Sequence, residues 1–219
     1  MPAGIIDQLQ GVETKAQTLL NPDPRLQKAL DASKAAGLPE IYISEQQGQY
    51  LSIICQLVGA KNVLEIGALG GYSTIWLAKT GAHVTSIEIN PKHRDVALAN
   101  TKGQGFDNVD VILGSSLEVM PKLAEEGKKF DLVFIDAGWG DQWDNFQWAV
   151  KLTRKGGAIY LDNVVMKILY AKEGKSEETL VEKVGKDKRV DATLINTIAA
   201  FRGHPEAMVD GFILATVKE

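Results

Sequence analysis

The 219-residue sequence is poor in several features, and each shortage excludes a class of protein. It has one cysteine, Cys55, so an internal disulfide is impossible, and the apolar neighbours of Cys55 predict a buried thiol. The first twenty residues contain no apolar run long enough for a signal peptide or a membrane helix, so we expect a soluble cytoplasmic protein without membrane partners. An excess of basic residues is missing too. The net charge of −4 argues against a nucleic-acid partner.

The composition is that of an ordinary globular domain, with 45% hydrophobic and 24% charged residues. A chain of this mass buries about 70% of its surface on folding, so a single large core is possible without disulfides. The loop candidates are too short to be interdomain linkers. We therefore predict one domain over 1–219, with N-terminal helices over 1–58 and an α/β core over 62–219.

The first third of the chain shows helical spacing of its apolar residues. Ser44 is placed to cap a helix that carries Leu51, Ile54 and Val58 on one face, with Gln47 at the capping-box position. From residue 62 onward, short apolar runs alternate with helical patterns, which predicts a parallel sheet with helices on both faces. The five predicted strands are 63–66, 84–89, 109–113, 130–135 and 157–161.

The C-terminal residues show a different pattern. We expect a helix over 194–201, followed by strands 206–209 and 212–217 around the turn signal Asp210-Gly211. Such a hairpin would add an antiparallel pair at the edge of the sheet. The predicted fold is a Rossmann-like α/β fold with a seven-stranded, mostly parallel sheet and extra N-terminal helices.

Right-handed crossovers bring the carboxyl ends of the parallel strands to one rim, where open α/β sheets bind ligands. Gly67, Gly70 and Gly71 follow the first strand, and such a turn lets the backbone approach a ligand, although some turns of this kind bind nothing. The spacing matches neither a P-loop nor a dinucleotide fingerprint. Glu65 beside it favours a positively charged ligand over a pyrophosphate.

Further polar residues end the next two strands. Glu88, about twenty residues beyond the glycines, is an expected acceptor for two ribose hydroxyls, and its alternative is a solvated strand end. Ser115 and Ser116 either line an adenine pocket or cap the helix that follows them.

The fourth and fifth strands end at Asp136 and at Asp162-Asn163. On neighbouring strands these oxygen-bearing side chains would converge, and two carboxylates with an amide suit Mg²⁺ or Mn²⁺. No histidine is nearby to suggest zinc. The alternative is that the two aspartates cap helices or turns.

Together the motifs resemble the SAM-dependent (S-adenosylmethionine-dependent) O-methyltransferases of class I, specifically the metal-dependent catechol and caffeoyl-CoA group. The resemblance covers about 41–217. Its densest segments are EQQGQYLS (45–52), AKNVLEIGALGGYS (60–73), SIEINP (86–91), FIDA (134–137) and LDNVV (161–165).

The resemblance implies a role for each matching residue. Asp136, Asp162 and Asn163 match the three ligands of Mg²⁺, Mn²⁺ or Ca²⁺, and Asp136 also matches a catalytic and cofactor-contacting position. Lys167 matches a substrate-contacting residue. The positions that match the rest of the SAM site are Ile43, Glu65, Gly67, Ala68, Ser73, Glu88, Ser116 and Leu117. The resemblance also implies a homodimer and a small phenolic substrate, such as a catechol or a flavonoid.

One departure concerns the proton acceptor. The family has a lysine a few residues after the first metal aspartate, whereas Asp136 is followed by AGWGDQWDNF, and Gly138 stands where the plant enzymes have a cofactor-contacting aspartate. Lys167, Asp141 or a water would then take the phenol proton, and we favour Lys167; its alternative is a solvated surface lysine. Trp139 and Trp143 are candidates for a wall against a flat substrate, with core packing as the alternative, and we expect Trp148 in the core.

Other functions remain open at this point. An NAD-dependent oxidoreductase would explain the glycines and Glu88 but not Glu65 or the acidic set. A methyltransferase-like protein that holds SAM without turnover is favoured only by the missing lysine. A third alternative keeps methyl transfer and changes the acceptor to a hydroxamate or a carboxylate.

Overall fold

The computed structural model describes residues 5–21, 23–170, 178–200 and 207–218. The N-terminal helices are α1 (Ile5–Ala16), η1 (Gln17–Leu19), α2 (Pro24–Ala35) and α3 (Glu45–Leu57). The alternating part contains β1 (Asn62–Ile66), α4 (Tyr72–Ala78), β2 (His83–Glu88), α5 (Pro91–Asn100), η2 (Lys102–Gln104), β3 (Val109–Leu113), α6 (Ser116–Glu125), β4 (Phe130–Ile135), η3 (Trp139–Asp141), α7 (Gln142–Leu152) and β5 (Thr153–Leu161). The remaining elements are α8 (Val164–Tyr170), α9 (Leu180–Lys186), β6 (Val190–Ala200) and β7 (Ala207–Val217).

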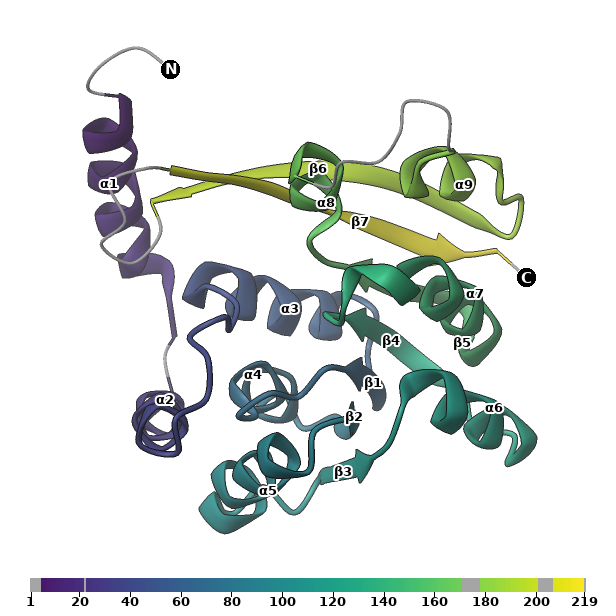
Figure 1. Cartoon of the computed structure of the whole chain (residues 1–219), viewed down its shortest axis with the longest axis horizontal. Coiled ribbons are helices and arrows are strands. Elements are labelled where there is room, and N and C mark those ends of the chain that lie inside the picture. Colours follow the sequence, from purple (N-terminus) through teal and green to yellow (C-terminus); the bar gives the residue numbers. More distant parts are fainter. Residues whose placement is uncertain (1–4, 22, 171–177, 201–206, 219) are drawn as a thin grey trace.

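The seven strands form one sheet in the order β3-β2-β1-β4-β5-β7-β6 (Figure 1). The first five strands in this order run parallel, and β7 is antiparallel to both β5 and β6. The chain moves outward from β1 to β3 and then returns to β4 on the other side of β1. This reversal creates the switch point at which ligands bind in open α/β sheets.

Local capping explains where several helices begin. The Ser44 hydroxyl accepts a hydrogen bond from Gln47 N at 3.1 Å and caps α3 as predicted. Asn90 Oδ1 accepts from Lys92 N at 2.9 Å at the start of α5, where Pro91 occupies the first position. Both caps satisfy backbone donors that have no partner inside the helix.

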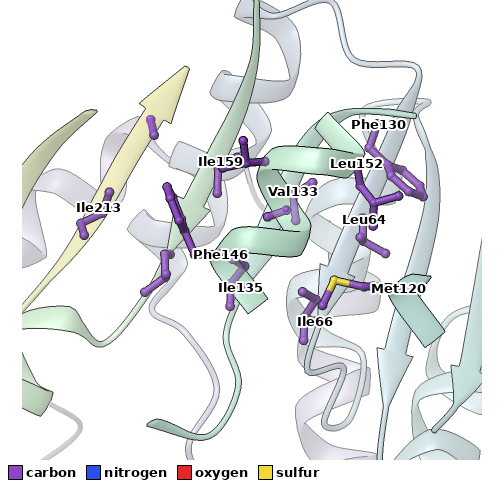
Figure 2. Close-up of a cluster of buried hydrophobic side chains, with 14 of the residues drawn as sticks. Leu64, Ile66, Met120, Phe130, Val133, Ile135, Phe146, Leu152, Ile159 and Ile213 are labelled. Carbon is purple, nitrogen blue, oxygen red and sulfur yellow. The ribbon is translucent and has the colours of Figure 1, made fainter. Parts of the chain in front are cut away.

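Alternation along the strands sends neighbouring side chains into two cores. In β4, Val133 and Ile135 belong to the core under α6 and α7, whereas Leu132 and Phe134 belong to the core under α3 and α4. Figure 2 shows the first of these cores, in which Phe146 of α7 and Met120 of α6 lie over the sheet. Cys55 is buried in the second core, as predicted, and burial raises the pKa of its thiol to about 12.

The sheet ends in an antiparallel pair of strands, as predicted, but the residues that form this pair differ from the predicted ones. The segment expected as a helix over 194–201 lies in β6 as far as residue 200, the last one described there. Asp210-Gly211 is not a turn, because Asp210 pairs with Thr197 and Gly211 with Asn196 inside a continuous ladder. The antiparallel edge pair is therefore β6 with β7.

The physical reasons lie in side-chain preference and packing. β6 is rich in β-branched residues, which favour a strand over the expected helix. A Cβ at Gly211 would lie 2.6 Å from the Ile195 carbonyl oxygen and from the Val165 side chain. Glycine is thus needed at 211 for close packing and not for a turn.

No helix among the described residues is long and apolar enough to span a lipid bilayer.

Candidate functional site

A cavity of about 580 Å³ lies at the switch point of the sheet. Its walls come from the loops after the carboxyl ends of β1 to β4, from α2 and from the segment before α3. The residues that the argument uses are Ser33, Ile43, Gly67, Ala68, Ser73, Glu88, His93, Ser116, Asp136, Asp141 and Asn145. The rim residues predicted from β1, β2, β3 and β4 thus meet around one space.

The glycines after β1 are required by the protein's own packing. A Cβ at Gly67 would overlap the Asp136 carbonyl oxygen, and one at Gly70 would overlap the Ser33 hydroxyl on α2. Gly71 has φ of 82° at the start of α4, a conformation that L side chains rarely adopt. The missing side chains therefore make room for β4, α2 and α5, while the backbone of Gly67 and Gly70 also lines the cavity, and the expected approach of this backbone to a ligand stays a prediction.

Glu65 of β1 is fully buried and does not itself line the cavity. Its Oε1 accepts a hydrogen bond from Ser73 at 2.5 Å, and its Oε2 accepts from Thr74 at 2.5 Å and from Ser86 at 2.6 Å. Burial raises the pKa of Glu65, and the three hydroxyl donors oppose that rise. Glu65 therefore reaches the cavity through Ser73, which lines it.

Glu88 lines the cavity with a carboxylate whose orientation is fixed. Its Oε2 accepts from Leu69 N and its Oε1 accepts from Asn90 N, both at 2.8 Å. His93 Nδ1 lies 3.8 Å from Oε1. A carboxylate held in this way keeps further lone pairs for hydroxyl donors inside the cavity.

Asp136 and Asp162 are neighbours across the parallel ladder. Ile135 pairs with Leu161, so the two aspartates take the next position on each strand, and Asp162 N donates to the Ile135 carbonyl at 2.9 Å. Burial raises the pKa of Asp136, and repulsion from Asp162, Glu65 and Asp210 raises it further. Burial also raises the pKa of Asp162 to about 7, with repulsion from Asp210 adding to it.

The chain holds Asp162 in place with two glutamines that sequence reasoning did not identify as site residues. Gln47 Nε2 donates to Asp162 Oδ2 at 2.8 Å and to the Tyr160 hydroxyl at 2.9 Å, so it makes no capping box with Ser44. Gln142 Nε2 donates to the Asp162 carbonyl at 3.0 Å. The resemblance around 45–52 was the only signal for Gln47, and it could not show this contact.

Asp136 lines the cavity, Asp162 and Asn163 follow the neighbouring strand without lining it, and the three side chains together are a donor set that suits a hard divalent cation. Buried carboxylates that repel one another are stabilised by a cation between them, and carboxylate and amide oxygens are the ligands that Mg²⁺ prefers. Within the described ranges, no three His, Cys, Asp or Glu side chains form a metal-binding group. A cation here would therefore rest on Asp136, Asp162 and the amide of Asn163.

The other predicted site residues separate into two groups. Ile43 is buried and lines the cavity, and Ser116 donates to Asn145 Oδ1 at 2.7 Å on its wall. Ser115 stands at the N-cap of α6 without a side-chain cap hydrogen bond, so neither serine is a side-chain cap. Leu117 packs against the first core, and Lys167 donates from Nζ to the Trp139 carbonyl at 2.9 Å without lining the cavity.

The tryptophans also differ from one another. Trp143 stacks on Phe146 at a centroid distance of 5.9 Å and packs against the first core, so core packing replaces the predicted substrate wall at that residue. Trp148 also packs against that core, as predicted. Trp139 is 37% exposed in the loop between Gly138 and Asp141, which both line the cavity.

Comparisons with known proteins agree with this fold. The family model described as O-methyltransferase matches residues 20–200. The chain is 40% identical over 210 residues to a catechol O-methyltransferase of Mycobacterium tuberculosis, with 92% of each protein covered. An O-methyltransferase from Bacillus cereus in complex with SAH has a TM-score of 0.86 at 34% identity, covering 97% of this chain and 100% of that one. An O-methyltransferase of tomaymycin synthesis from Streptomyces achromogenes, in complex with SAM, has a TM-score of 0.85 at 30% identity, covering 97% and 98%.

Proposed function

The chain belongs to the O-methyltransferase family and is a SAM-dependent O-methyltransferase, and from that premise we propose that it methylates a hydroxyl of a vicinal dihydroxyphenol with the help of a divalent cation. One observation carries the finer proposal. The buried, mutually repelling pair Asp136 and Asp162 lies at the carboxyl ends of β4 and β5, and Asp136 also lines the cavity that contains Glu88. The catechol O-methyltransferase relative supports the acceptor class.

The cavity residues divide the proposed contacts with SAM. The backbone of Gly67 and Ala68, with the Ser73 hydroxyl, would surround the methionine part. Glu88 would accept hydrogen bonds from the two ribose hydroxyls, because its orientation is already fixed by Leu69 N and Asn90 N. Ser116 would lie at the adenine and Ile43 would cover the cofactor, whereas Leu117, which packs against the first core, would support the adenine end from behind Ser116.

Asp136, Asp162 and Asn163 would hold the cation. When bound, a divalent cation stabilises a phenolate and so lowers a phenol pKa that is otherwise near 10. Two adjacent acceptor oxygens on one ion would also fix which hydroxyl faces the methyl group, and holding two reactants in line removes an entropic barrier. Gln47 and Gln142 keep Asp162 in its position.

Lys167 is the proposed proton acceptor for the phenol. It follows the acidic pair closely in the chain, and its Nζ bonds to the carbonyl of Trp139, in the loop where the family carries its lysine. Lys167 would have to turn away from Trp139 to reach an acceptor. Asp141, which lines the cavity, is the second candidate for this role.

Methyl transfer from SAM to a catechol, caffeic acid and a flavonol, each with Mg²⁺ and with EDTA, tests the proposal. We expect methylated product that disappears with EDTA. Product that persists with EDTA would refute the cation role of Asp136, Asp162 and Asn163. Cofactor binding without product from any phenol would point to another acceptor, such as a hydroxamate or a carboxylate.

We also propose a homodimer. Ile53 and Leu57 lie one turn apart on α3 and are 43% and 81% exposed, which leaves apolar surface for a second copy. Sedimentation equilibrium of the purified chain tests this, and a monomer at micromolar concentration would refute it.

A further inference from the structure

Asp210 contacts the residues that follow β5, although it is far from them in sequence. β7 runs antiparallel to β5 with Ile213 opposite Leu161, so the residues before Ile213 continue past the carboxyl end of β5. There, Asp210 Oδ2 accepts from Asn163 Nδ2 at 2.9 Å, and Asp210 Oδ1 accepts from Met166 N at 2.9 Å. One side chain of β7 thus connects the third proposed cation ligand to the first turn of α8.

The contact decides which end of the Asn163 amide faces Asp210. An ionised carboxylate only accepts hydrogen bonds, whereas an amide has a donor nitrogen and an acceptor oxygen. With Nδ2 directed to Asp210, the Asn163 Oδ1 faces the other side. The flipped amide would place two acceptors against each other. Since only the oxygen can bind a hard cation, Asp210 selects the amide orientation that allows Asn163 to be a ligand.

Two further observations favour orientation of Asn163 over direct ligation by Asp210. Asp210 Oδ1 also accepts from Gly211 N at 2.7 Å, so both of its oxygens are engaged by N–H donors. Asn163 has φ of 58°, a left-handed conformation that fixes where its side chain starts. α8 contacts β7 (Figure 1), and the absent Cβ at Gly211 lets Val165 of α8 approach closely.

We propose that Asp210 is a positioning residue for the cation site, because its hydrogen bond from Asn163 Nδ2 directs the Asn163 amide oxygen toward the cation. This inference rests on the proposed function, since it concerns the same site as Asp136, Asp162 and Asn163. Hydrogen-bond partners of metal ligands change metal affinity by about 10- to 100-fold.

A double-mutant cycle on Mn²⁺ affinity tests the inference, read from the EPR signal of free Mn²⁺ with the full chain and no SAM or acceptor. D210N is isosteric, and since its Oδ1 still accepts from Met166 N, its Nδ2 faces Asn163 and forces that amide to turn over. N163G removes the amide at a φ that glycine tolerates. We expect each single variant to bind Mn²⁺ about 10- to 100-fold more weakly, and the double variant to bind no more weakly than N163G.

The control is D191N, which removes a carboxylate on β6 that bonds Lys218 and should bind Mn²⁺ as wild type does. Wild-type affinity in D210N would overturn the inference alone. So would a further tenfold loss on adding D210N to N163G, because Asp210 would then act through its charge. Wild-type protein that binds no Mn²⁺ would overturn the cation role and the inference with it. If D210N alone fails to fold, the comparison of the double variant with N163G decides by the same criterion.

Discussion

At the scale of single residues, Glu88 is the clearest example of a cavity side chain whose orientation is already fixed. Leu69 N and Asn90 N hold its two oxygens, so no rotamer freedom is lost when a ligand binds. Burying the Glu88 carboxylate at the cavity wall is unfavourable, and hydrogen bonds from the hydroxyls of a ribose would offset this.

We predict that Glu88→Gln weakens SAH binding by about 10- to 150-fold, because a hydrogen bond to a charged group contributes roughly 1.5–3 kcal/mol. The new amide nitrogen also faces one of the two backbone N–H groups. Isothermal titration with SAH measures the effect. Glu125→Gln on the exposed side of α6 is the control and should bind as wild type does. If Glu88→Gln binds SAH as tightly as wild type does, the role of Glu88 is only to hold the loop after β1 through Leu69 N.

Trp139 and Trp148 allow a direct comparison of a loop aromatic with a core aromatic. Trp139→Ala should raise KM for aromatic acceptors by about 2- to 12-fold, the equivalent of 0.5–1.5 kcal/mol for an aromatic contact, with a small change in Tm. Trp148→Ala should instead lower the free energy of unfolding by about 1–3 kcal/mol, because its side chain is partly buried against the first core, and leave KM unchanged. Steady-state kinetics and thermal melts of both variants measure this, and the reverse pattern would make Trp139 a core residue.

At the scale of elements, α2 and the loop after β1 form one wall of the cavity. Asn100 Nδ2 donates to the Gly70 carbonyl at 2.8 Å and to the Ala29 carbonyl of α2 at 3.2 Å, so α5 holds both elements together. Ser33 of α2 fills the space next to Gly70. Any group added at Gly70 must therefore displace α2.

We predict that Gly70→Ala lowers the free energy of unfolding by about 1–3 kcal/mol through overpacking against Ser33, and that it weakens SAH binding as well. Gly185→Ala in α9 is the matched control, because its Cβ position has no neighbour within 4 Å outside the local backbone of α9 and alanine favours a helix by about 0.5–1 kcal/mol. Urea denaturation and SAH titration test the pair. Equal stability of the two variants would contradict the close packing of α2 on the loop.

At the scale of the whole molecule, the buried acidic pair makes stability depend on pH. Burial raises the pKa of Asp162 to about 7 and raises the pKa of Asp136, so the folded chain keeps protons that the unfolded chain releases above about pH 4. The stabilising contribution of Asp162 is complete below about pH 4 and is lost as the pH rises through about 7, and that of Asp136 is likewise lost as the pH rises. Asp187 behaves oppositely, because its hydrogen bond with Arg189 lowers its pKa to about 2, and its contribution is lost only in stronger acid.

We therefore predict that Tm in EDTA falls between pH 5 and pH 8, because the free energy of unfolding decreases by at most about 1.4 kcal/mol per pH unit for each proton released. Mg²⁺ should raise Tm most at pH 8, where the pair is ionised. Asp162→Asn should flatten the slope, whereas Asp191→Asn should retain it. Differential scanning calorimetry across this range measures the effect, and a Tm that rises with pH in EDTA would contradict the assignment.

Local interactions in the sequence determined most of the fold. The alternation of apolar runs predicted β3 and β4 to the residue, and Ser44 and Asn90 mark the starts of their helices, because capping and burial pattern act over a few neighbouring residues. The motifs also predicted that Asp136, Glu88 and Ser73 meet at one cavity, since parallel strands end at the same rim.

Only the tertiary structure decided which distant residues become partners. Gly70 is glycine because of Ser33, 37 positions earlier, and Asp210-Gly211 pairs with β6 and with Asn163 instead of turning. The Gln47 side chain does not complete a capping box with Ser44 and instead donates a hydrogen bond to Asp162, 115 positions away. The physical reason is that a buried polar group must form a hydrogen bond within the protein, and a buried Cβ must fit the space that its neighbours leave. The packing of helices on the sheet, and not the adjacent sequence, determines which residues are those neighbours.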